Sequence, residues 1–102
     1  MAMIPPVDRH ELVAFCRRHH IATLEIFGSR ARGDARSDSD LDLLVTFEPG
    51  HNPGLEFFGL ADGLQQLFGV EVDLLTRRTV EADRNPIFKA QVLGTVETLY
   101  AA

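Results

Sequence analysis

The sequence predicts a fold of the α/β or α+β class, in which helices pack on a small mixed β-sheet. Segments with the 3.6-residue period of amphipathic helices alternate with segments whose apolar residues follow the two-residue period of strands. Clusters of glycine, proline and small polar residues separate these segments. Because the chain has 102 residues, of which 45% are hydrophobic, we expect one domain spanning residues 1–102 with its own core.

The first half of the chain predicts four elements. In order they are a helix, a strand, a short helix and a second strand, at residues 8–19, 22–27, 29–32 and 40–47. Asp8 can cap the first helix, and Glu11 stands three residues later, as in a capping box. Gly33 can close the short helix, and the polar residues that follow it predict a loop before the second strand.

The second half of the chain also predicts four segments. They are a helix, a third strand, a loop and a final helix, at residues 55–69, 70–76, 77–84 and 85–100. Gly69 is suited to end the first of these helices, and Asn85 followed by Pro86 is suited to start the last one. Four residues form the buried stripe of the final helix: Phe88, Val92, Val96 and Leu99. Three phenylalanines are expected in the core, one of them free to stack on a base: Phe57, Phe58 and Phe68.

Composition and charge argue against several classes of protein, among them nucleic-acid-binding and membrane proteins. The formal net charge is −5, which argues against direct binding to nucleic acid, because that requires basic surface. A nucleotide substrate stays possible, since metal ions bridge acidic residues to phosphates. Cys16 is the only cysteine, so no intrachain disulfide can form. The sequence has neither a signal-peptide pattern nor an apolar segment of membrane-spanning length, and we expect a cytoplasmic protein without membrane contact.

Three aspartates carry the strongest chemical signal. Residues two apart on a strand point to the same face, so Asp40 and Asp42 project together. Asp73, on the third predicted strand, joins them if that strand lies beside the second one. Adjacent carboxylates repel one another unless a cation neutralises them, and Mg²⁺ prefers such hard oxygen ligands. Three acids so placed can hold two Mg²⁺ ions about 3.5–4 Å apart, the geometry of in-line phosphoryl displacement.

A glycine and a serine precede these acids and suit an anion. Gly28 permits a sharp turn and close approach to a ligand, and Ser29 begins a short helix whose backbone N–H groups can face a phosphate. Arg30 and Arg32 are candidates for phosphate contacts, because a guanidinium matches phosphate oxygens well. Together these residues indicate a nucleotide site.

The spacing of these residues resembles that of a known family. Gly28 and Ser29, ten residues, and then Asp40, Leu41 and Asp42 form the pattern G-S-x10-D-x-D. This pattern resembles the nucleotidyltransferase superfamily that includes DNA polymerase beta. The short chain and the segments "FGSRARGDARSDSDLDLLV" and "VDLLT" look like the minimal nucleotidyltransferases, small prokaryotic proteins often encoded beside a HEPN-domain partner in toxin–antitoxin pairs.

The resemblance implies a polymerase beta-like palm fold and a transfer of AMP from ATP to a hydroxyl. It implies that Asp40 and Asp42 bind both Mg²⁺ ions, and that Asp73 binds the catalytic ion and helps to deprotonate the hydroxyl. Gly28 and Ser29 would hold the triphosphate. The implied acceptor is a tyrosine of a HEPN toxin, so the chain would form a hetero-oligomer with that partner.

Two other functions stay open. The first is a binding module, in which an antitoxin neutralises its toxin by contact alone and the acids only hold nucleotide. The intact set of Asp40, Asp42 and Asp73 favours an enzyme, and variants that replace these acids separate the two functions. The second is modification of a small molecule such as an aminoglycoside, which ranks lower because such enzymes usually add a second domain to hold the acceptor.

Overall fold

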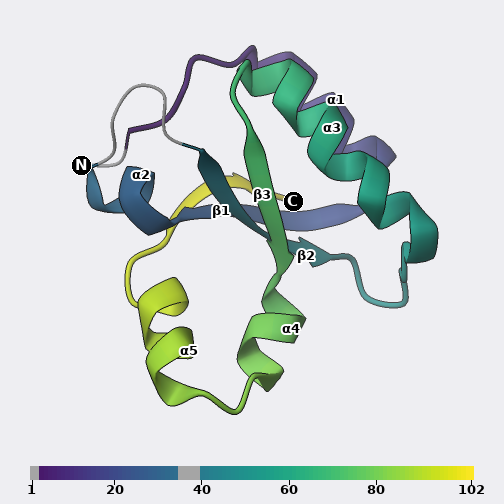
Figure 1. The fold of residues 1–102 in the computed structure, drawn as a ribbon. Helices are drawn as coiled ribbons and strands as arrows, with labels where there is room; N and C mark the ends of the chain where they lie inside the picture. Colours follow the sequence, from purple (N-terminus) through teal and green to yellow (C-terminus); the bar gives the residue numbers. More distant parts are fainter. Residues whose placement is uncertain (1–2, 35–39) are drawn as a thin grey trace.

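The structure is a computed structural model that describes residues 3–34 and 40–102. Figure 1 shows the course of the chain through these residues. In chain order the helices and strands are α1 (Arg9–Arg18), β1 (Ile21–Phe27), α2 (Gly28–Arg32), β2 (Leu41–Phe47), the 3-10 helix η1 (Gly54–Glu56), α3 (Phe57–Phe68), β3 (Val72–Thr76), α4 (Arg77–Ala82), α5 (Pro86–Leu93) and β4 (Glu97–Ala101).

The strands form one mixed sheet in the order β3-β2-β1-β4. β2 and β3 are parallel, whereas β1 is antiparallel to both of its neighbours, β2 and β4. Helices α1 and α3 lie side by side on one face of the sheet, and α4 and α5 lie below it in the view of Figure 1. The predicted small mixed sheet with helices packed on it is therefore confirmed.

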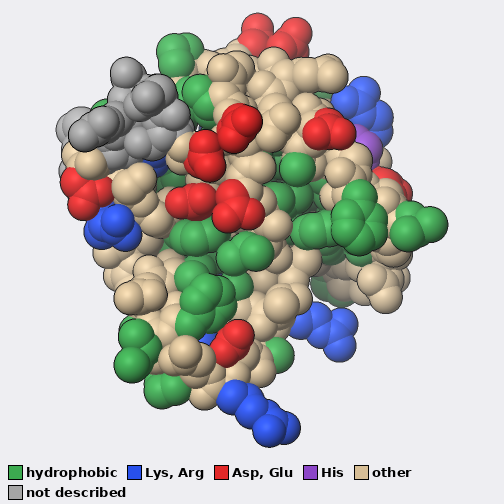
Figure 2. All heavy atoms as spheres, viewed as in Figure 1, with side chains coloured by type: hydrophobic (Ala, Val, Ile, Leu, Met, Phe, Trp, Pro, Cys, Tyr) green, Lys and Arg blue, Asp and Glu red, His purple; other side chains and the backbone are tan. Residues whose placement is uncertain are grey.

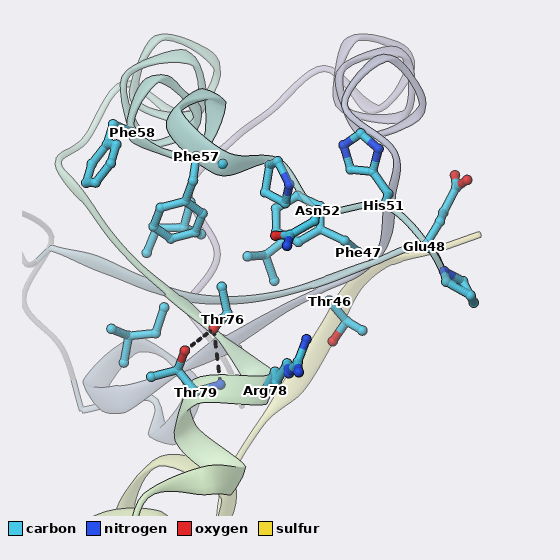
Figure 3. A pocket seen from close by; sticks show the side chains of 17 residues that line it. Thr46, Phe47, Glu48, His51, Asn52, Phe57, Phe58, Thr76, Arg78 and Thr79 are labelled. Atoms are coloured by element: carbon cyan, nitrogen blue, oxygen red, sulfur yellow. Dashed lines mark hydrogen bonds between the residues drawn. The ribbon is translucent and has the colours of Figure 1, made fainter.

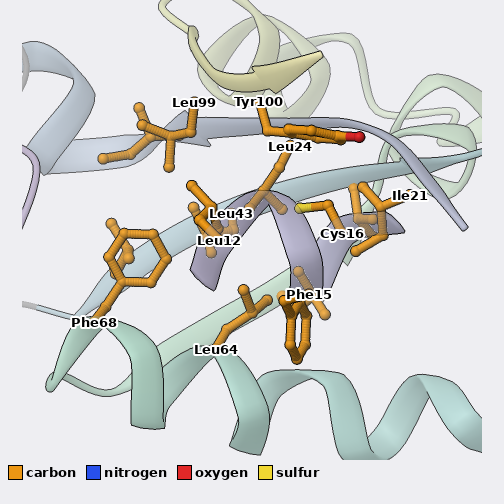
Figure 4. Close-up of a cluster of buried hydrophobic side chains, with 14 of the residues drawn as sticks. Leu12, Phe15, Cys16, Ile21, Leu24, Leu43, Leu64, Phe68, Leu99 and Tyr100 are labelled. Carbon is orange, nitrogen blue, oxygen red and sulfur yellow. The ribbon is translucent and has the colours of Figure 1, made fainter. Parts of the chain in front are cut away.

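The main core lies between the sheet and the pair α1 and α3. Figure 4 shows α1 side chains, such as Cys16, meeting strand side chains, such as Leu43, and α3 side chains, such as Leu64. The two helices pack closely because Gly63 leaves room for a ring: a Cβ there would lie 2.6 Å from Phe15 Cε2. This contact explains a glycine inside a helix, where it costs about 1 kcal/mol relative to alanine.

A second, smaller core lies on the opposite face of the sheet. Phe27 of β1 and Leu44 of β2 pack there against Val80 of α4 and Val92 of α5. Because both faces of the sheet are covered, β1 and β2 are apolar on both sides over part of their length. This face is the one from which the candidate site projects.

The predicted caps fix several element boundaries. Asp8 accepts a hydrogen bond from the Glu11 backbone N–H at 3.1 Å, and Asn85 accepts bonds from the backbone N–H groups of Ile87 and Phe88. Gly33 ends α2 in the left-handed region at φ 81°, which favours glycine. These boundary predictions are confirmed.

Two predictions for the second half of the chain are wrong. The segment 77–84 was expected as a loop, yet residues Arg77–Ala82 form α4, because Thr76 caps it by accepting a hydrogen bond from the Thr79 backbone N–H. The final helix was expected to continue to residue 100, yet it ends at Leu93 before Gly94. Residues Glu97–Ala101 instead form β4, which pairs with the free edge of β1. Among the residues that the structure describes, no helix is long and apolar enough to span a membrane.

Candidate active site

The three aspartates lie near the amino ends of the two parallel strands, β2 and β3. Asp42 of β2 stands directly opposite Asp73 of β3, and a backbone bond from Leu41 N to Glu71 O, 2.8 Å long, fixes this register. Asp40 immediately precedes β2 and is exposed. The adjacency of the two acidic strands, on which the predicted three-acid set depended, is therefore confirmed.

The acids lie on the face that carries the second core. Asp42 has the same orientation on β2 as Leu44, which packs with Val80 of α4 and Val92 of α5. Figure 2 shows acidic side chains gathered in the middle of this face, above a hydrophobic surface that extends toward α5. Helices α4 and α5 thus cover one end of this face and leave the acids open to an incoming molecule.

Gly28 is packed directly against Asp42. The antiparallel register pairs Phe27, the last residue of β1, with Asp42, so the turn that follows β1 reaches the acid. Gly28 has φ 75°, and a Cβ at this position would overlap Asp42 Oδ2 and lie 3.2 Å from Asp42 Cγ. Both the backbone conformation and the lack of a side chain are required here. The glycine of the predicted pattern therefore brings the start of α2 against the carboxylate.

Burial and like charge raise the pKa of Asp42. Partial burial is the larger cause, followed by the charges of Asp73 and then Asp40, whereas the positive charge of Arg32 acts in the opposite direction. Arg32 is exposed, and its Nε donates to Asp34 Oδ2 at 3.2 Å. The positive charge of Arg32 thus acts on Asp42, and its contact with phosphate stays a prediction.

The donor set suits a hard divalent cation. Burial contributes most to the raised pKa of Asp42, and the charges of Asp73 and Asp40 add to it. A cation among the three carboxylates would relieve that repulsion. The residues present therefore fit Mg²⁺ chemically. Within 3–34 and 40–102, however, no three His, Cys, Asp or Glu side chains converge closely enough to form a ready-made metal site.

The other predicted site residues lie on α2. Ser29 is half-buried in the first turn of α2, next to Gly28. Arg30 is buried, and its Nη1 donates to the Met3 carbonyl at 3.2 Å, while Met3 N donates to the Arg30 carbonyl at 2.7 Å. The structure thus gives Arg30 a contact with the N-terminal segment, and its contact with phosphate stays a prediction.

One network near the site was not predicted. Arg77, the first residue of α4, donates from Nη1 to Glu25 Oε1 at 2.7 Å and from Nε to Glu81 Oε1 at 2.8 Å. These bonds raise the pKa of Arg77 and tie α4 to β1. The four-residue spacing of Arg77 and Glu81 is a helix signal that contradicts the expected loop.

Known proteins are similar to this chain in sequence and in fold. The model of the nucleotidyltransferase domain family matches residues 10–93. Protein adenylyltransferase MntA of Thermococcus cleftensis is 38% identical over 66 residues, which are 64% of this chain and 65% of that protein. A solved structure named as that of a minimal nucleotidyltransferase is 41% identical, with a TM-score of 0.65, and the match covers 89% of this chain and 88% of that one.

A toxin–antitoxin complex has the same fold. One chain in the structure of a tri-AMPylated Shewanella oneidensis HEPN toxin with its MNT antitoxin matches this chain with a TM-score of 0.59 and 18% identity. The match covers 92% of this chain and 70% of that chain. At this identity the similarity concerns the fold alone. Nucleotidyltransferases of this fold generally use a divalent metal. From the matched domain and the minimal structure, the chain belongs to the nucleotidyltransferase domain family and, within it, to the minimal nucleotidyltransferases.

Proposed function

We propose that this protein transfers AMP from ATP to a hydroxyl of a partner protein, as a single domain covering residues 1–102. The observation that carries the proposal is the contact between Gly28 and Asp42, with Asp73 in register beside Asp42. A turn able to hold a triphosphate then faces carboxylates able to hold its counter-ions. Such a site catalyses phosphoryl transfer by positioning and by charge neutralisation.

The residues divide into two groups in this reaction. Gly28 and Ser29 hold the triphosphate at the start of α2, with Arg32, and by prediction Arg30, contributing positive charge. The acceptor hydroxyl oxygen attacks the α-phosphorus, the bond from that phosphorus to the bridging oxygen breaks, and pyrophosphate leaves. Asp73, which is exposed at the amino end of β3, accepts the proton of the hydroxyl.

Magnesium is the metal we propose for this site. Asp40 and Asp42 would hold two ions, and Asp73 would share the one nearest the acceptor. When bound, the ions neutralise charge on the triphosphate and on the leaving pyrophosphate. After burial, the charges of Asp73 and Asp40 are the next causes of the raised pKa of Asp42. A cation would remove that repulsion, which supports this assignment.

For the acceptor, we propose a tyrosine of a HEPN-domain toxin, with which the chain forms a hetero-oligomer. The relative from Thermococcus cleftensis is named a protein adenylyltransferase, and the Shewanella complex holds an AMPylated HEPN toxin. Both support a protein acceptor. We place the reaction in the cytoplasm, where ATP is supplied and where the buried Cys16 needs no disulfide partner.

The first experiment is a calorimetric titration of ATP into the purified protein with and without Mg²⁺. We expect binding that requires Mg²⁺ in the wild type and no binding in the Asp40→Asn/Asp42→Asn variant. Asp62→Asn, an exposed aspartate on α3, is the matched control and should bind as the wild type does. Magnesium-independent binding, or equal binding by the double variant, would contradict the proposed site.

A second experiment separates catalysis from neutralisation by contact. A HEPN-domain toxin that binds this chain is incubated with ATP, Mg²⁺ and either wild type or the double variant, and the intact mass of the toxin is measured. We expect added AMP with the wild type only. If the double variant protects cells from the toxin as well as the wild type does, contact alone neutralises the partner.

A further inference from the structure

A pocket lies at the carboxyl ends of β2 and β3, at the opposite end of these strands from the acids. Its volume is about 790 Å³. We call it the distal pocket, and its principal lining residues are Phe47, Asn52, Phe57, Phe58, Arg78 and Thr79. Thr46, which also lines it, follows Asp42 by four residues on β2, so along the strand the two sites are about 13 Å apart.

The position and size of the distal pocket suit a small molecule. In open α/β sheets, ligands bind beyond the carboxyl ends of parallel strands, and β2 and β3 are the parallel pair of this sheet. The volume lies within the range of small-molecule sites, about 300–1,000 Å³. The distal pocket therefore has both the place and the dimensions of a ligand site.

Its walls differ in chemistry. Figure 3 shows Phe57 and Phe58 projecting from the start of α3 on one side, and Thr79 and Arg78 at the start of α4 on the other. Phe58 is 74% exposed, whereas Phe57 packs against the main core and Phe68 lies in it, so Phe58 is the one ring of the three left free. The distal pocket thus has an aromatic wall on the α3 side and a polar wall on the α4 side.

One charged group of the distal pocket can take a ligand as its partner. Arg78 is exposed and makes no ion pair or hydrogen bond with any residue in 3–34 or 40–102. Because an accessible guanidinium makes strong charged hydrogen bonds with anions, a ligand with an anionic group fits the distal pocket better than a purely apolar one.

We propose that the distal pocket binds a small planar aromatic molecule that carries an anionic group. The rings of Phe57 and Phe58 are nearly perpendicular, at 78°, so one would stack on the planar part and the other would contact its edge. The Arg78 guanidinium would pair with the anion. This site is independent of the proposed nucleotidyl transfer, because it shares no lining residue with the acids, Gly28 or Ser29.

The test uses 8-anilinonaphthalene-1-sulfonate, an aromatic sulfonate whose fluorescence rises on binding. We expect saturable binding to the intact protein with one site per chain. Arg78→Gln should weaken this binding about tenfold, since it removes a charged hydrogen bond. Arg84→Gln, which changes an exposed arginine outside the distal pocket, should leave it unchanged. N-phenyl-1-naphthylamine, which has the same rings without the sulfonate, should bind both variants equally.

A second pair of variants tests the aromatic wall. Phe58→Ser should weaken binding of both probes. Ile87→Ser is the control and should leave binding unchanged, because Ile87 is an apolar residue of α5 with a similar exposed fraction, 68%. Binding that ignores Arg78 and Phe58, or that does not saturate, would overturn the proposal. So would displacement of the sulfonate by ATP, which would make the pocket part of the nucleotide site. Loss of probe binding as the protein dimerises at high concentration would mean that a second copy fills the pocket, and would overturn it as well.

Discussion

The two ends of the parallel pair β2 and β3 differ in packing and in charge. At the amino ends, Asp42 and Asp73 stand in register, and Gly28 fills the remaining space against Asp42. At the carboxyl ends, Phe47, Phe57 and Phe58 line part of a pocket of about 790 Å³, and Arg78 supplies positive charge. One end is crowded and acidic, and the other is open, apolar and in part cationic.

This difference follows from the direction of β1. Because β1 is antiparallel to β2, its carboxyl end meets the amino ends of β2 and β3. The turn after β1 therefore brings Gly28 and the start of α2 to the acids. A purely parallel sheet would send that turn to the opposite end, where only the distal pocket lies. One antiparallel strand thus places an anion-binding turn opposite a set of carboxylates.

The largest expected effect comes from Asp42→Asn. Loss of one carboxylate from a site built on charge neutralisation should lower the rate of AMP transfer by about three orders of magnitude. The free energy of unfolding should not fall, because the substitution removes a partly buried charge that Asp73 and Asp40 repel. Transfer is measured by intact mass of the partner, and unfolding by urea denaturation.

Asp62→Asn is the control for that experiment, since Asp62 is exposed on α3 and lies outside both ends of the pair. A large loss of stability in Asp42→Asn would indicate that Asp42 supports the fold instead of the chemistry. An unchanged rate of transfer would remove Asp42 from the site.

The next largest effect concerns Gly28. Gly28→Ala should destabilise the protein by about 2–3 kcal/mol, from left-handed backbone strain and from overlap with the Asp42 carboxylate. Gly50 has a similar φ of 82° with nothing within 4 Å of an added Cβ, so Gly50→Ala should cost only about 1 kcal/mol. Urea denaturation measures the unfolding free energy of each variant, and the difference between them is the cost of the overlap between the added Cβ of residue 28 and Asp42.

A double variant sharpens this comparison. Adding Gly28→Ala to Asp42→Ala should cost no more than Gly50→Ala does, because the overlapping carboxylate is then gone. If Gly28→Ala costs the same in both backgrounds, the close approach of Gly28 to Asp42 contributes nothing, and backbone strain explains the whole effect.

The amino end could be predicted from the sequence because its signals are local. Alternation on one strand aligns Asp40 with Asp42, a glycine follows the first strand, and Asp73 has an apolar neighbour on each side. Only the adjacency of β2 and β3 had to be assumed. The elements in this part of the chain have strong periods and clear caps, and their boundaries agree with the prediction within about two residues.

The carboxyl end and the C-terminal segment could not be predicted because they depend on tertiary contacts. Residues 97–101 look like the end of a helical stripe, since Val92, Val96 and Leu99 have helical spacing. The free edge of β1 pairs with this segment instead, and Leu99 then joins the main core. Likewise, Phe58 follows Phe57 in sequence, but only the position of α3 over the sheet leaves Phe58 exposed.

A smaller effect should appear in the pH dependence of stability. The pKa of Asp42 in the folded protein is raised above its ordinary value of 3.8. At pH values between 3.8 and the pKa of the folded protein, the folded protein therefore binds more protons than the unfolded chain. The stabilising contribution of protonated Asp42 is therefore complete below about pH 3.8 and is lost as the pH rises through the folded pKa. We expect the unfolding free energy of the wild type, minus that of Asp42→Asn, to fall over this interval.

Urea denaturation in metal-free buffer at a series of pH values measures this difference. Glu71→Gln is the control, because Glu71 is an exposed acid just before β3 and does not act on the pKa of Asp42. Addition of Mg²⁺ should reduce the dependence on pH, since the ion stabilises the charged carboxylate. A difference that rises with pH would mean that the site favours charged Asp42 even without a cation.

The smallest effect is expected at the other end of the strands. Phe58→Ser should change the free energy of unfolding by less than about 0.5 kcal/mol, because the ring is 74% exposed and loses little buried surface. Phe68→Ser, on the same helix but only 4% exposed, should cost about 3–5 kcal/mol. The contrast is measured by urea denaturation, and neither rate nor ATP affinity should respond to Phe58→Ser. If Phe58→Ser lowers the free energy of unfolding as much as Phe68→Ser does, the start of α3 packs onto the strand ends and the distal pocket is closed in solution. The two ends of the pair would then be more alike than the structure indicates. A neutral Phe58→Ser instead leaves an aromatic surface that stability does not require, which is the condition for its use in binding.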